Sequence, residues 1–578
     1  MSTNISKKKR DDLLDKIKQI RAFIAAAPQD ENTGNLLSYL SDLEKDVNGK
    51  KYGLVFEEHR EEIDEVLDTH TPVLTEDKDL FIDNGGQMNF LIEGDNLASL
   101  KLLEKTHKGK IDLIYIDPPY NTGNKDFIYD DSFIDKNDLF SHSKWLSFIK
   151  HRLLIARNLL TKRGAIFISI DDNEQSPLKV LCDEIFGAEN FVTCLVWAAG
   201  RKNDSKYISV SHEYMLCYVK SMEYLKTNKI VWKQRKQGID DIYKEYEQLK
   251  KKYGSDYREM SSALKQWYKN LPENHPARNH SHYNFIDETG IYFPSDISWP
   301  GGGGPKYEVL HPITHKPVRV PNRGWVYPTK ERMQEIISQK LVHFGDDETS
   351  VPCKKTYLKD NEMSTPYSVF YKDGRAATKR LRTIMGENVF QNPKDEEILE
   401  SIIEFAALYN STILDFFAGS GTTGHAVMKL NAEDGGNRKF ILCTNNENGI
   451  CRDVTYERIR RVIDKEDYAA SLKYYKVDYV PISDRMYYEY ADELLRHIRE
   501  LVELENGINF TGNEEIAIVL TEDELAAFIA DKDRFAKCRR LYMGHDLLPD
   551  EAQETALSKN KIEISIIPDY YYRDLQEG

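Results

Sequence analysis

Two apolar runs in the chain have the pattern of buried strands. The run at 111–116 reads Ile-Asp-Leu-Ile-Tyr-Ile and leads into Asp117-Pro118-Pro119-Tyr120. The run at 411–417 leads into a glycine-rich turn, and the helical pattern of 425–430 follows. A short apolar run that ends in a turn is typical of a strand in an α/β sheet. Each run is therefore expected to form a strand, and the loop after the first run lies where open α/β sheets bind ligands.

The segment 117–120 has groups that could activate an exocyclic amine of a nucleobase. The lone pair of such an amine is delocalised into the ring, so the amine must be drawn toward tetrahedral geometry before it attacks a methyl donor. Asp117 and the Pro118 carbonyl could each accept one N–H, and the prolines, with φ near about −65°, would fix that carbonyl. Tyr120 could stack on the base. An ordinary turn is the alternative, because Asp and Pro favour turns for local reasons.

The glycine-rich turn begins at Asp415 and has the spacing G-x-G-x-x-G from Gly419. Glycines let the backbone approach a ligand closely, and the following helix offers free N–H groups. The same spacing occurs in dinucleotide-binding loops, but here the next strand, at 439–443, is followed by its first acidic residue only at Glu447. A phosphate-binding loop requires a Lys-Ser or Lys-Thr step after its glycines, and no such step follows the glycines here.

Together the two motifs resemble the amino-methyltransferases of DNA, which use S-adenosylmethionine. Most of residues 50–480 is similar to the modification subunits of type III restriction-modification systems. The motif order, with the catalytic motif first and the cofactor loop last, is that of the group called β. The resemblance implies an α/β fold, with a Rossmann-like S-adenosylmethionine-dependent methyltransferase core, an inserted target-recognition domain and an α+β C-terminal domain.

The resemblance also implies the reaction, which is methyl transfer from S-adenosylmethionine to adenine N6 in double-stranded DNA. A cytosine-N4 methyltransferase and a non-catalytic DNA-recognition subunit are the alternatives. Asp117 favours adenine, because related cytosine-N4 enzymes more often have Ser there. Attack on carbon 5 of cytosine is disfavoured, since the Pro352-Cys353 step lies outside the core. The expected catalytic residues are Asp117, Pro118, Pro119 and Tyr120, and the expected cofactor-binding residues are Asp95, Asp415, Phe416, Phe417, Ala418, Gly419, Ser420, Gly421 and Thr422.

One departure concerns the strand that follows the glycine-rich turn. The family often has an acidic residue at the end of this strand, where this chain has Thr444. The resemblance therefore does not identify a ligand for the ribose of the cofactor.

The length of 578 residues, with 40% hydrophobic content, exceeds what one core usually holds. Five segments are expected: an N-terminal helical region at 1–75, the catalytic half of the core at 76–224, a target-recognition insertion at 225–385, the cofactor-binding half at 386–480, and a C-terminal α+β domain at 481–578.

Charge is distributed unevenly along the chain, whose net charge is −16. Residues 221–390 have 28 Lys and Arg against 21 Asp and Glu, a net of +7, whereas residues 484–578 have 11 against 22, a net of −11. Charge acts where it is placed, so the middle segment is the candidate DNA surface and the acidic C-terminal segment fits a protein partner better. A solvated Lys-rich insertion is the alternative. Within the middle segment, basic and aromatic residues interleave, and the candidate DNA-binding residues are Arg323, Lys330, Lys354 and Lys355.

The remaining expectations concern location, metals and partners. No signal peptide is visible and no apolar run approaches the ~20 residues of a membrane span, so a cytoplasmic protein without a membrane partner is expected. Seven cysteines without a Cys-x-x-Cys step argue against a zinc site and a disulfide scaffold, and no metal is expected. The expected partners are double-stranded DNA, a second copy in a homodimer, and a restriction (Res) subunit.

Overall fold

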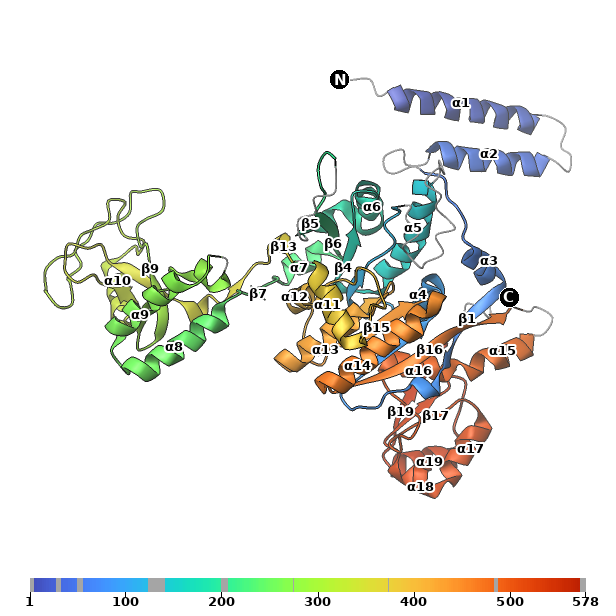
Figure 1. Ribbon diagram of the computed structural model, residues 1–578. Helices are drawn as coiled ribbons and strands as arrows, with labels where there is room; N and C mark the ends of the chain where they lie inside the picture. Colours follow the sequence, from blue (N-terminus) through green and yellow to red (C-terminus); the bar gives the residue numbers. More distant parts are fainter. Residues whose placement is uncertain are drawn as a thin grey trace. The chain divides into compact units, whose positions relative to one another are not determined.

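The structure is a computed structural model. It describes residues 5–26, 33–48, 56–122, 141–198, 206–273, 275–372, 374–482 and 487–571. The chain divides into two compact units, one formed by 1–229 with 368–578 and the other by 230–367. Figure 1 shows both units, coloured along the sequence.

A ten-stranded sheet forms the centre of the first unit, in the order β1-β16-β2-β15-β14-β3-β4-β6-β5-β13. From β16 to β4 all neighbouring strands are parallel, while β1 and β6 run antiparallel to the strands beside them. The strands are β1 (His70–Glu76), β2 (Gln87–Glu93), β3 (Ile111–Ile116), β4 (Leu160–Ile170), β5 (Phe191–Ala198), β6 (His212–Val219), β13 (Val369–Tyr371), β14 (Thr412–Asp415), β15 (Lys439–Thr444) and β16 (Ala470–Pro481).

The two apolar runs of the sequence are neighbours in this sheet, because Ile413 pairs with Leu113 and Leu414 with Ile114 in parallel register. Their side chains are fully buried, as expected for strands covered on both faces. The expected α/β class is thus confirmed, and the strand that precedes Asp117 lies beside the strand that precedes the glycine-rich turn.

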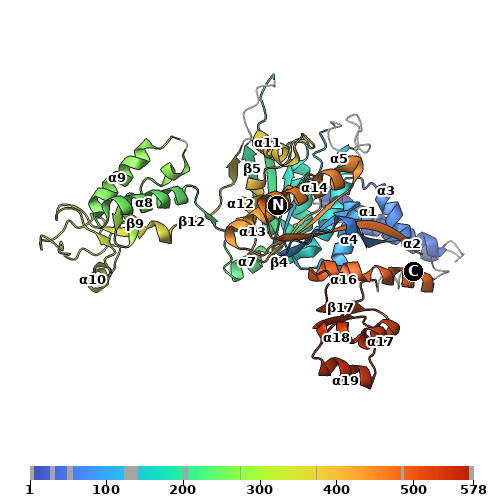
Figure 2. The same cartoon turned by 60° about the horizontal axis from the view of Figure 1, so that its bottom comes forward.

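Helices of the first unit form two packed groups. One contains α4, α5, α6 and α16, and the other contains α11 to α14. Figure 2 shows the central sheet and these helices in a second view. The helices are α1 (Ile5–Ala26), α2 (Thr33–Asn48), α3 (Glu62–Thr69), α4 (Asn96–His107), α5 (Ser141–Leu159), α6 (Gln175–Cys182), α7 (Met222–Thr227), α11 (Gly374–Met385), α12 (Glu396–Ala406), α13 (Thr422–Asp434), α14 (Glu457–Glu466), α15 (Tyr487–Arg496) and α16 (Ile498–Asn506). No helix of the described ranges is both long and apolar enough to cross a membrane.

The last part of the chain adds a three-stranded parallel sheet in the order β17-β18-β19. One of its faces packs on a core that includes Leu525, Phe528 and Leu557, and the other contributes Tyr542 and Ile567 to the main core of the unit. Its elements are β17 (Ile516–Val519), α17 (Glu522–Ala530), α18 (Lys532–Lys537), β18 (Arg540–Met543), α19 (Glu551–Lys559) and β19 (Glu563–Ile566).

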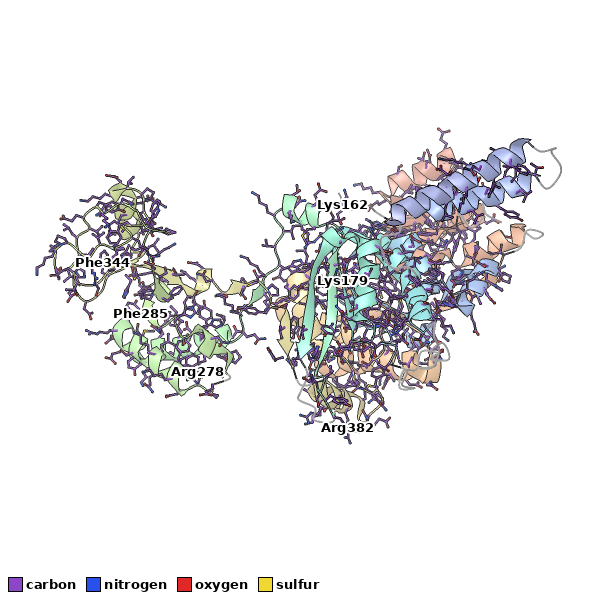
Figure 3. The ribbon with its side chains drawn as sticks, turned by 90° about the horizontal axis from the view of Figure 1, so that it is seen from above. Lys162, Lys179, Arg278, Phe285, Phe344 and Arg382 are labelled. Atoms are coloured by element: carbon purple, nitrogen blue, oxygen red, sulfur yellow. The ribbon has the colours of Figure 1, made fainter. Side chains whose placement is uncertain are left out.

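The second unit contains an antiparallel sheet in the order β10-β11-β9-β8 and the strand pair β12-β7. Aromatic rings fill it. Phe285 packs on Tyr292 and His343, and Phe344 meets His311 edge-on. Figure 3 labels Phe285 and Phe344 in this unit. Its elements are β7 (Gln234–Arg235), α8 (Ile239–Tyr253), α9 (Tyr257–Asn270), β8 (Phe285–Asp287), β9 (Gly290–Ser295), α10 (Lys330–Ser338), β10 (Val342–His343), β11 (Cys353–Tyr357) and β12 (Met363–Ser364).

Two of the expected segment boundaries differ from the structure. The N-terminal region at 1–75 is not helical throughout, because residues 70–76 form β1 and pair with β16. The insertion does not extend to residue 385, because β13 pairs with β5 of the central sheet and α11 packs on α14. Both differences arise from pairing with distant segments, which local sequence patterns do not report.

A buried ion cluster ties the helix α16 to the central sheet. The ammonium of Lys473 in β16 lies 2.5 Å from Glu503 of α16 and 2.9 Å from Glu76 of β1, and its side chain is 0% exposed. Glu503 also accepts the Tyr475 hydroxyl at 2.9 Å and the Phe510 backbone N–H at 2.7 Å. Each polar group thus has a partner, so loss of the lysine would leave buried carboxylates without a counter-charge.

The first prediction follows from this cluster. Lys473→Met should lower the free energy of unfolding by about 3–5 kcal/mol, because it strands buried carboxylates. Lys476→Met is the matched control on the same strand, since Lys476 pairs with Asp77 but is 36% exposed, and such exposed pairs contribute less than about 1 kcal/mol. Urea unfolding followed by circular dichroism measures both. Equal effects of the two substitutions would contradict the role given to the buried cluster.

Candidate active site at the edge of the central sheet

The expected catalytic and cofactor loops meet at one edge of the sheet. Asp117 follows β3 and Asp415 ends β14, and these two parallel strands are hydrogen-bonded neighbours. Parallel strands present their carboxyl ends at the same edge, so the two loops emerge side by side although 298 positions separate them in the sequence.

Asp117 and Tyr120 belong to a cluster of polar side chains contributed by distant segments. The Tyr120 hydroxyl lies 2.9 Å from Asp117 Oδ1 and 3.1 Å from Glu213 Oε2. Lys394 Nζ lies 2.5 Å from the same hydroxyl, 2.5 Å from Glu213 Oε2 and 3.2 Å from Asp117 Oδ1. The cluster therefore holds two carboxylates, one ammonium and one phenol.

Local structure positions the two residues that the sequence analysis did not identify. Glu213 lies on β6 opposite Trp197 of β5. Lys394 directly precedes Asp395, the N-cap of α12, which accepts the Glu397 N–H at 2.9 Å. The side chain of Lys394 is only 11% exposed. The cap fixes where the chain enters the helix, and this places Lys394 against the catalytic loop.

Burial and neighbouring charges act in opposite directions on this cluster. Burial raises the pKa of Asp117 above its ordinary value, the Lys394 ammonium opposes this, and the Glu213 carboxylate adds to it. Burial lowers the pKa of Lys394, but the charges of Asp117 and Glu213 outweigh burial and raise it. Burial also raises the pKa of the Tyr120 phenol, with Asp117 and Glu213 acting in the same direction, so Tyr120 stays neutral.

The rest of the loop that follows β3 is fixed by contacts to buried groups. Pro118 and Pro119 are buried, and the Pro119 carbonyl accepts the indole N–H of Trp145 at 2.7 Å. Asn121 has a φ of +57° and donates to the buried carboxylate of Glu174 at 2.5 Å. These contacts lock both sides of the loop. The residues that follow, 123–140, lie outside the described ranges.

The glycine-rich loop turns tightly onto the N-terminus of α13. Gly419 and Gly421 have φ of +49° and +73°, values that favour glycine. The Gly421 N–H donates to the Ala418 carbonyl at 2.8 Å, and the Ala418 N–H to the Cys443 carbonyl of β15 at 3.1 Å. Gly424 has a different role, because a Cβ there would lie 2.8 Å from Ile459 Cδ1, so the glycine allows α13 to pack closely on α14.

Asp415 is the buried carboxyl group of this loop, with 2% exposure. It accepts the Phe417 backbone N–H at 3.0 Å and the Thr423 hydroxyl at 2.5 Å. Burial raises its pKa to about 7 despite these hydrogen bonds. A small change in its surroundings would therefore change its ionisation near neutral pH.

A buried arginine supports the loop from α14. Arg458 is 1% exposed and donates to the Ser420 carbonyl and the Ser420 hydroxyl at 3.2 Å each, and to the Thr422 hydroxyl at 2.9 Å. Burial lowers its pKa to about 10, so it remains charged at neutral pH. Thus the side chains of Ser420 and Thr422 are engaged by the protein, and the sequence analysis gave no indication of this arginine.

Asp95 is the N-cap of α4 and accepts the N–H groups of Leu97 at 2.7 Å and Ala98 at 3.2 Å, both at Oδ1. Its Oδ2 atom lies 3.6 Å from the buried guanidinium of Arg152. The neighbouring residue Asn96 donates to the Phe416 carbonyl at 3.2 Å. Asp95 is therefore linked to the cofactor loop through one intervening residue.

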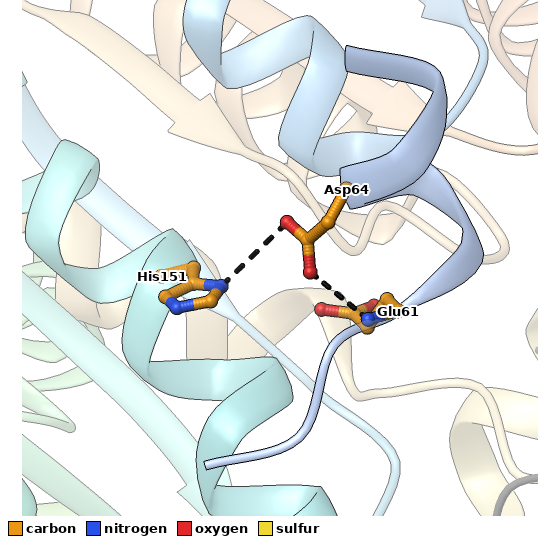
Figure 4. Close-up of side chains that lie close together, drawn as sticks. All are labelled: Glu61, Asp64 and His151. Carbon is orange, nitrogen blue, oxygen red and sulfur yellow. Dashed lines mark hydrogen bonds and ion pairs between the residues drawn. The ribbon is translucent and has the colours of Figure 1, made fainter. Parts of the chain in front are cut away.

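Glu61, Asp64 and His151 lie near this region with possible metal-binding atoms within 4.8 Å of one another (Figure 4). Their carboxylates are already used. Arg152 donates to both oxygens of Glu61 at 2.6 and 3.0 Å, and Asp64 accepts the Glu61 N–H at 2.9 Å as part of the capping box of α3. Glu61 and Asp64 thus cap the start of α3, and Glu61 also pairs with the charge of Arg152.

Two buried polar atoms at the end of β15 have no hydrogen-bond partner within the described part of the chain. They are Thr444 Oγ1 and Asn445 Oδ1. Buried polar atoms are rarely left unpaired, so such a pair at a ligand-binding edge suits the polar groups of a ligand. On the other side of the loop, the Phe390 ring lies 3.5 Å from where a Gly419 Cβ would be, which is an ordinary contact distance, so the positive φ and not a lack of space favours glycine there.

The four candidate DNA-binding residues lie in the second unit in different surroundings. Lys355 is 15% exposed and pairs with Asp287 at 2.6 Å, so it supports the sheet of that unit. Arg323 pairs with Asp296 at 2.6 Å and is 54% exposed. Lys330 at the start of α10 and Lys354 on β11 are exposed. Arg323, Lys330 and Lys354 are thus the exposed members of the set, with Arg323 in an ion pair, and DNA binding by any of the four stays a prediction.

Comparisons with known proteins agree with this geometry. A family model described as DNA methylase matches residues 111–456, which span both motifs. The type III restriction-modification enzyme EcoP15I Mod subunit of Escherichia coli is 37% identical over 388 residues, covering 62% of this chain and 58% of its own. The StyLTI Mod subunit of Salmonella typhimurium is 34% identical, and the alignment covers 66% of this chain and 58% of that subunit. The chain therefore spans 58% of the length of each of these two relatives.

A type II methyltransferase, M.KpnI of Klebsiella pneumoniae, is 34% identical over 363 residues, which cover 61% of this chain and 79% of that protein. Among solved structures, a putative DNA modification methylase from Thermus thermophilus complexed with S-adenosyl-L-methionine aligns with 12% identity and a TM-score of 0.30, covering 67% of this chain and 99% of that one. A TM-score this low adds nothing to the description of the fold. The matches to the family model and to M.KpnI show that this chain belongs to the DNA methylase family.

Proposed function

We propose that this chain transfers a methyl group from S-adenosylmethionine to N6 of adenine in double-stranded DNA, as the modification component of a restriction-modification system. The observation that carries the proposal is the meeting of the Asp117 loop and the Asp415 loop at the ends of neighbouring strands. Similarity to two Mod subunits supports the biological setting. A cytoplasmic location, a homodimer and a Res subunit as partner belong to the same proposal.

The residues at the edge of β14 and β15 fit S-adenosylmethionine, which supplies an activated methyl group when bound. Residues 415–422 would hold its methionine part, with the positive φ of Gly419 and Gly421 letting the backbone approach closely. Asp95 would contact its adenine. Thr444 and Asn445 have the unpaired buried oxygens that ribose hydroxyls could satisfy, and they take the place of the acidic residue common in the family.

The catalytic loop would orient the target amine. Asp117 and the Pro118 carbonyl would each accept one N–H of the amine, which draws its lone pair out of conjugation with the ring. A base inside a duplex cannot reach this loop, so the adenine would be flipped out and stacked on Tyr120. The hydrogen bonds of the Tyr120 hydroxyl fix the plane of its ring before the base arrives. Transfer is direct, without a covalent intermediate on the enzyme.

The choice of adenine over cytosine N4 rests on Asp117 as the first residue of the motif. A cytosine-N4 enzyme would use the same acceptor geometry, so the structure of the loop is compatible with both. Nucleoside mass spectrometry of DNA treated with the enzyme distinguishes N6-methyladenine from N4-methylcytosine directly.

The second prediction concerns Asp117. Asp117→Ala should abolish methyl transfer, because the amine loses its charged acceptor, while S-adenosylmethionine binding should stay within about tenfold, or about 1.4 kcal/mol, of wild type. Transfer of tritiated methyl groups to DNA from a host without adenine methylation measures the activity, and calorimetry measures S-adenosylmethionine binding. Asp478→Ala, at an exposed position of β16, should keep transfer activity. Near-normal turnover of Asp117→Ala would remove Asp117 from the mechanism.

The third prediction uses the pKa of Asp415, which burial raises to about 7. S-adenosylmethionine is cationic, so its affinity should rise about tenfold between pH 6 and pH 8 as Asp415 ionises. In the protein without cofactor, the raised pKa of Asp415 makes stability depend on pH in the opposite direction. The contribution of Asp415 to the free energy of unfolding is fully present at acidic pH and is lost as the pH rises through about 7.

Asp415→Asn is the matched control for this pH dependence. The α-amino group of the cofactor titrates near about pH 8 in both proteins, so the difference between them isolates Asp415. Calorimetric titration at pH 6, 7 and 8 should show a rise in affinity for wild type and a flat or falling profile for the variant. Parallel profiles would show that Asp415 does not sense the charge of the cofactor.

The fourth prediction concerns target recognition, which we assign to the separate unit 230–367 because all four candidate DNA-binding residues lie in it. Replacing this unit by its counterpart from a relative with another target should move the methylated sequence and leave the base and the methyl donor unchanged. Methylation-aware sequencing of host DNA reads the outcome. A folded, active chimera that keeps the original target sequence would place recognition elsewhere in the chain or in a partner.

A further inference from the structure

We propose that Lys394 is a positioning residue that keeps Asp117 in its carboxylate form with one oxygen occupied and the other directed to the target amine, and that Glu213 holds Lys394 in place. The inference rests on the proposed function for its place in catalysis. It concerns side chains that neither motif contains, since 274 positions separate Lys394 from Tyr120.

The ammonium of Lys394 meets three acceptors, which is the number of N–H donors it has. Its distances are 2.5 Å to the Tyr120 hydroxyl, 2.5 Å to Glu213 Oε2 and 3.2 Å to Asp117 Oδ1. A neutral amine would have only two N–H groups for these acceptors. The arrangement therefore selects the charged form of Lys394 and fixes its position between the two carboxylates.

The contacts of Asp117 divide its two oxygens. The Tyr120 hydroxyl and the Lys394 ammonium both engage Oδ1, at 2.9 and 3.2 Å. A carboxylate can accept about four hydrogen bonds over its two oxygens, so Oδ2 keeps its capacity for an incoming N–H. A protonated carboxyl would present a donor in place of one acceptor, which would disfavour binding of the amine hydrogens.

Lys394 also leaves the face of Tyr120 open. Its Nζ lies 2.5 Å from the hydroxyl oxygen but 4.8 Å from the ring centroid, so it sits at the hydroxyl end of the ring and not above its centre. A base can thus stack on Tyr120 while Lys394 stays in place. The lysine supports the site without competing with the substrate.

The groups that face Asp117 come from four elements packed around it. Lys394 precedes α12, Glu213 lies on β6, Tyr115 and Tyr120 flank Asp117 on its own segment, and Asp415 ends β14. Lys394 is the cation of this set. Lys394 and Glu213 must therefore shift the pKa of Asp117 in opposite directions, which gives the inference a specific test.

The first measurement is the pH dependence of single-turnover methyl transfer, with tritiated S-adenosylmethionine and DNA from a host without adenine methylation. Removing the opposite charge in Lys394→Met should move the midpoint of the acid limb upward by about 1–3 pH units. Glu213→Gln removes a like charge and should move it downward. Lys394→Arg keeps the charge and should restore most of the wild-type profile.

Lys429→Met is the matched control. Lys429 lies on α13 and also pairs with a carboxylate of the same unit, that of Glu400 at 2.7 Å. Its pH profile should match that of wild type. Thermal melting of each variant shows whether it is folded. Equal loss of activity at every pH in a folded Lys394→Met, with no change in the midpoint, would overturn the inference and leave Lys394 as a packing residue.

The second measurement does not depend on methyl transfer. A ¹³C NMR titration of the Asp117 carboxyl, assigned by its absence in Asp117→Asn, should give a higher midpoint in Lys394→Met and a lower one in Glu213→Gln than in wild type. Failure of wild type to methylate DNA would refute the proposed function, whereas unchanged NMR midpoints in both variants would refute the present inference by itself.

Discussion

The parallel pairing of β3 with β14 is the contact on which the candidate site depends. Each strand ends in a loop that holds one half of the candidate site. The loop after β3 has acceptors for an amine, and the loop after β14 is a glycine-rich turn onto a helix. Pairing Leu113 with Ile413 and Ile114 with Leu414 brings both loops to one edge of the sheet. The paired apolar side chains are fully buried between the helices on the two faces of the sheet, so their packing stabilises this pair of strands. The sheet therefore sets the distance between the two halves of the site.

Burial creates an electrostatic problem at this edge, and the site contains a solution to it. An amine acceptor works best as a carboxylate, but burial favours the protonated form of Asp117. Lys394 provides the compensating charge, and Glu213 and Tyr120 hold that charge in place. Asp415 instead accepts a backbone N–H and a hydroxyl, and burial raises its pKa to about 7. The two carboxyl groups thus differ in the groups that oppose the effect of burial, and a cationic cofactor would supply the charge that neutral hydrogen-bond donors do not give Asp415.

The sequence predicted the parts of the site that are local. An apolar run before Asp117 and another before the glycine-rich turn indicated two strands, and the structure confirms that they are neighbours. The roles of the individual residues at 117–120 and 415–422 stay predictions. Lys394, Glu213 and Arg458 could not be identified, because each acts through a contact between segments far apart in the chain and has no motif of its own. The strand at 70–76 was missed for the same reason, since it exists through pairing with β16.

The central claim is that this site methylates adenine in DNA. The most direct measurement is nucleoside mass spectrometry and methylation-aware sequencing of DNA from a bacterial host that lacks adenine methylation and expresses this chain. The account predicts N6-methyladenine at one recurring sequence, dependent on Asp117. DNA without a methylated base in cells that contain the folded protein, or methyl groups on cytosine alone, would contradict it.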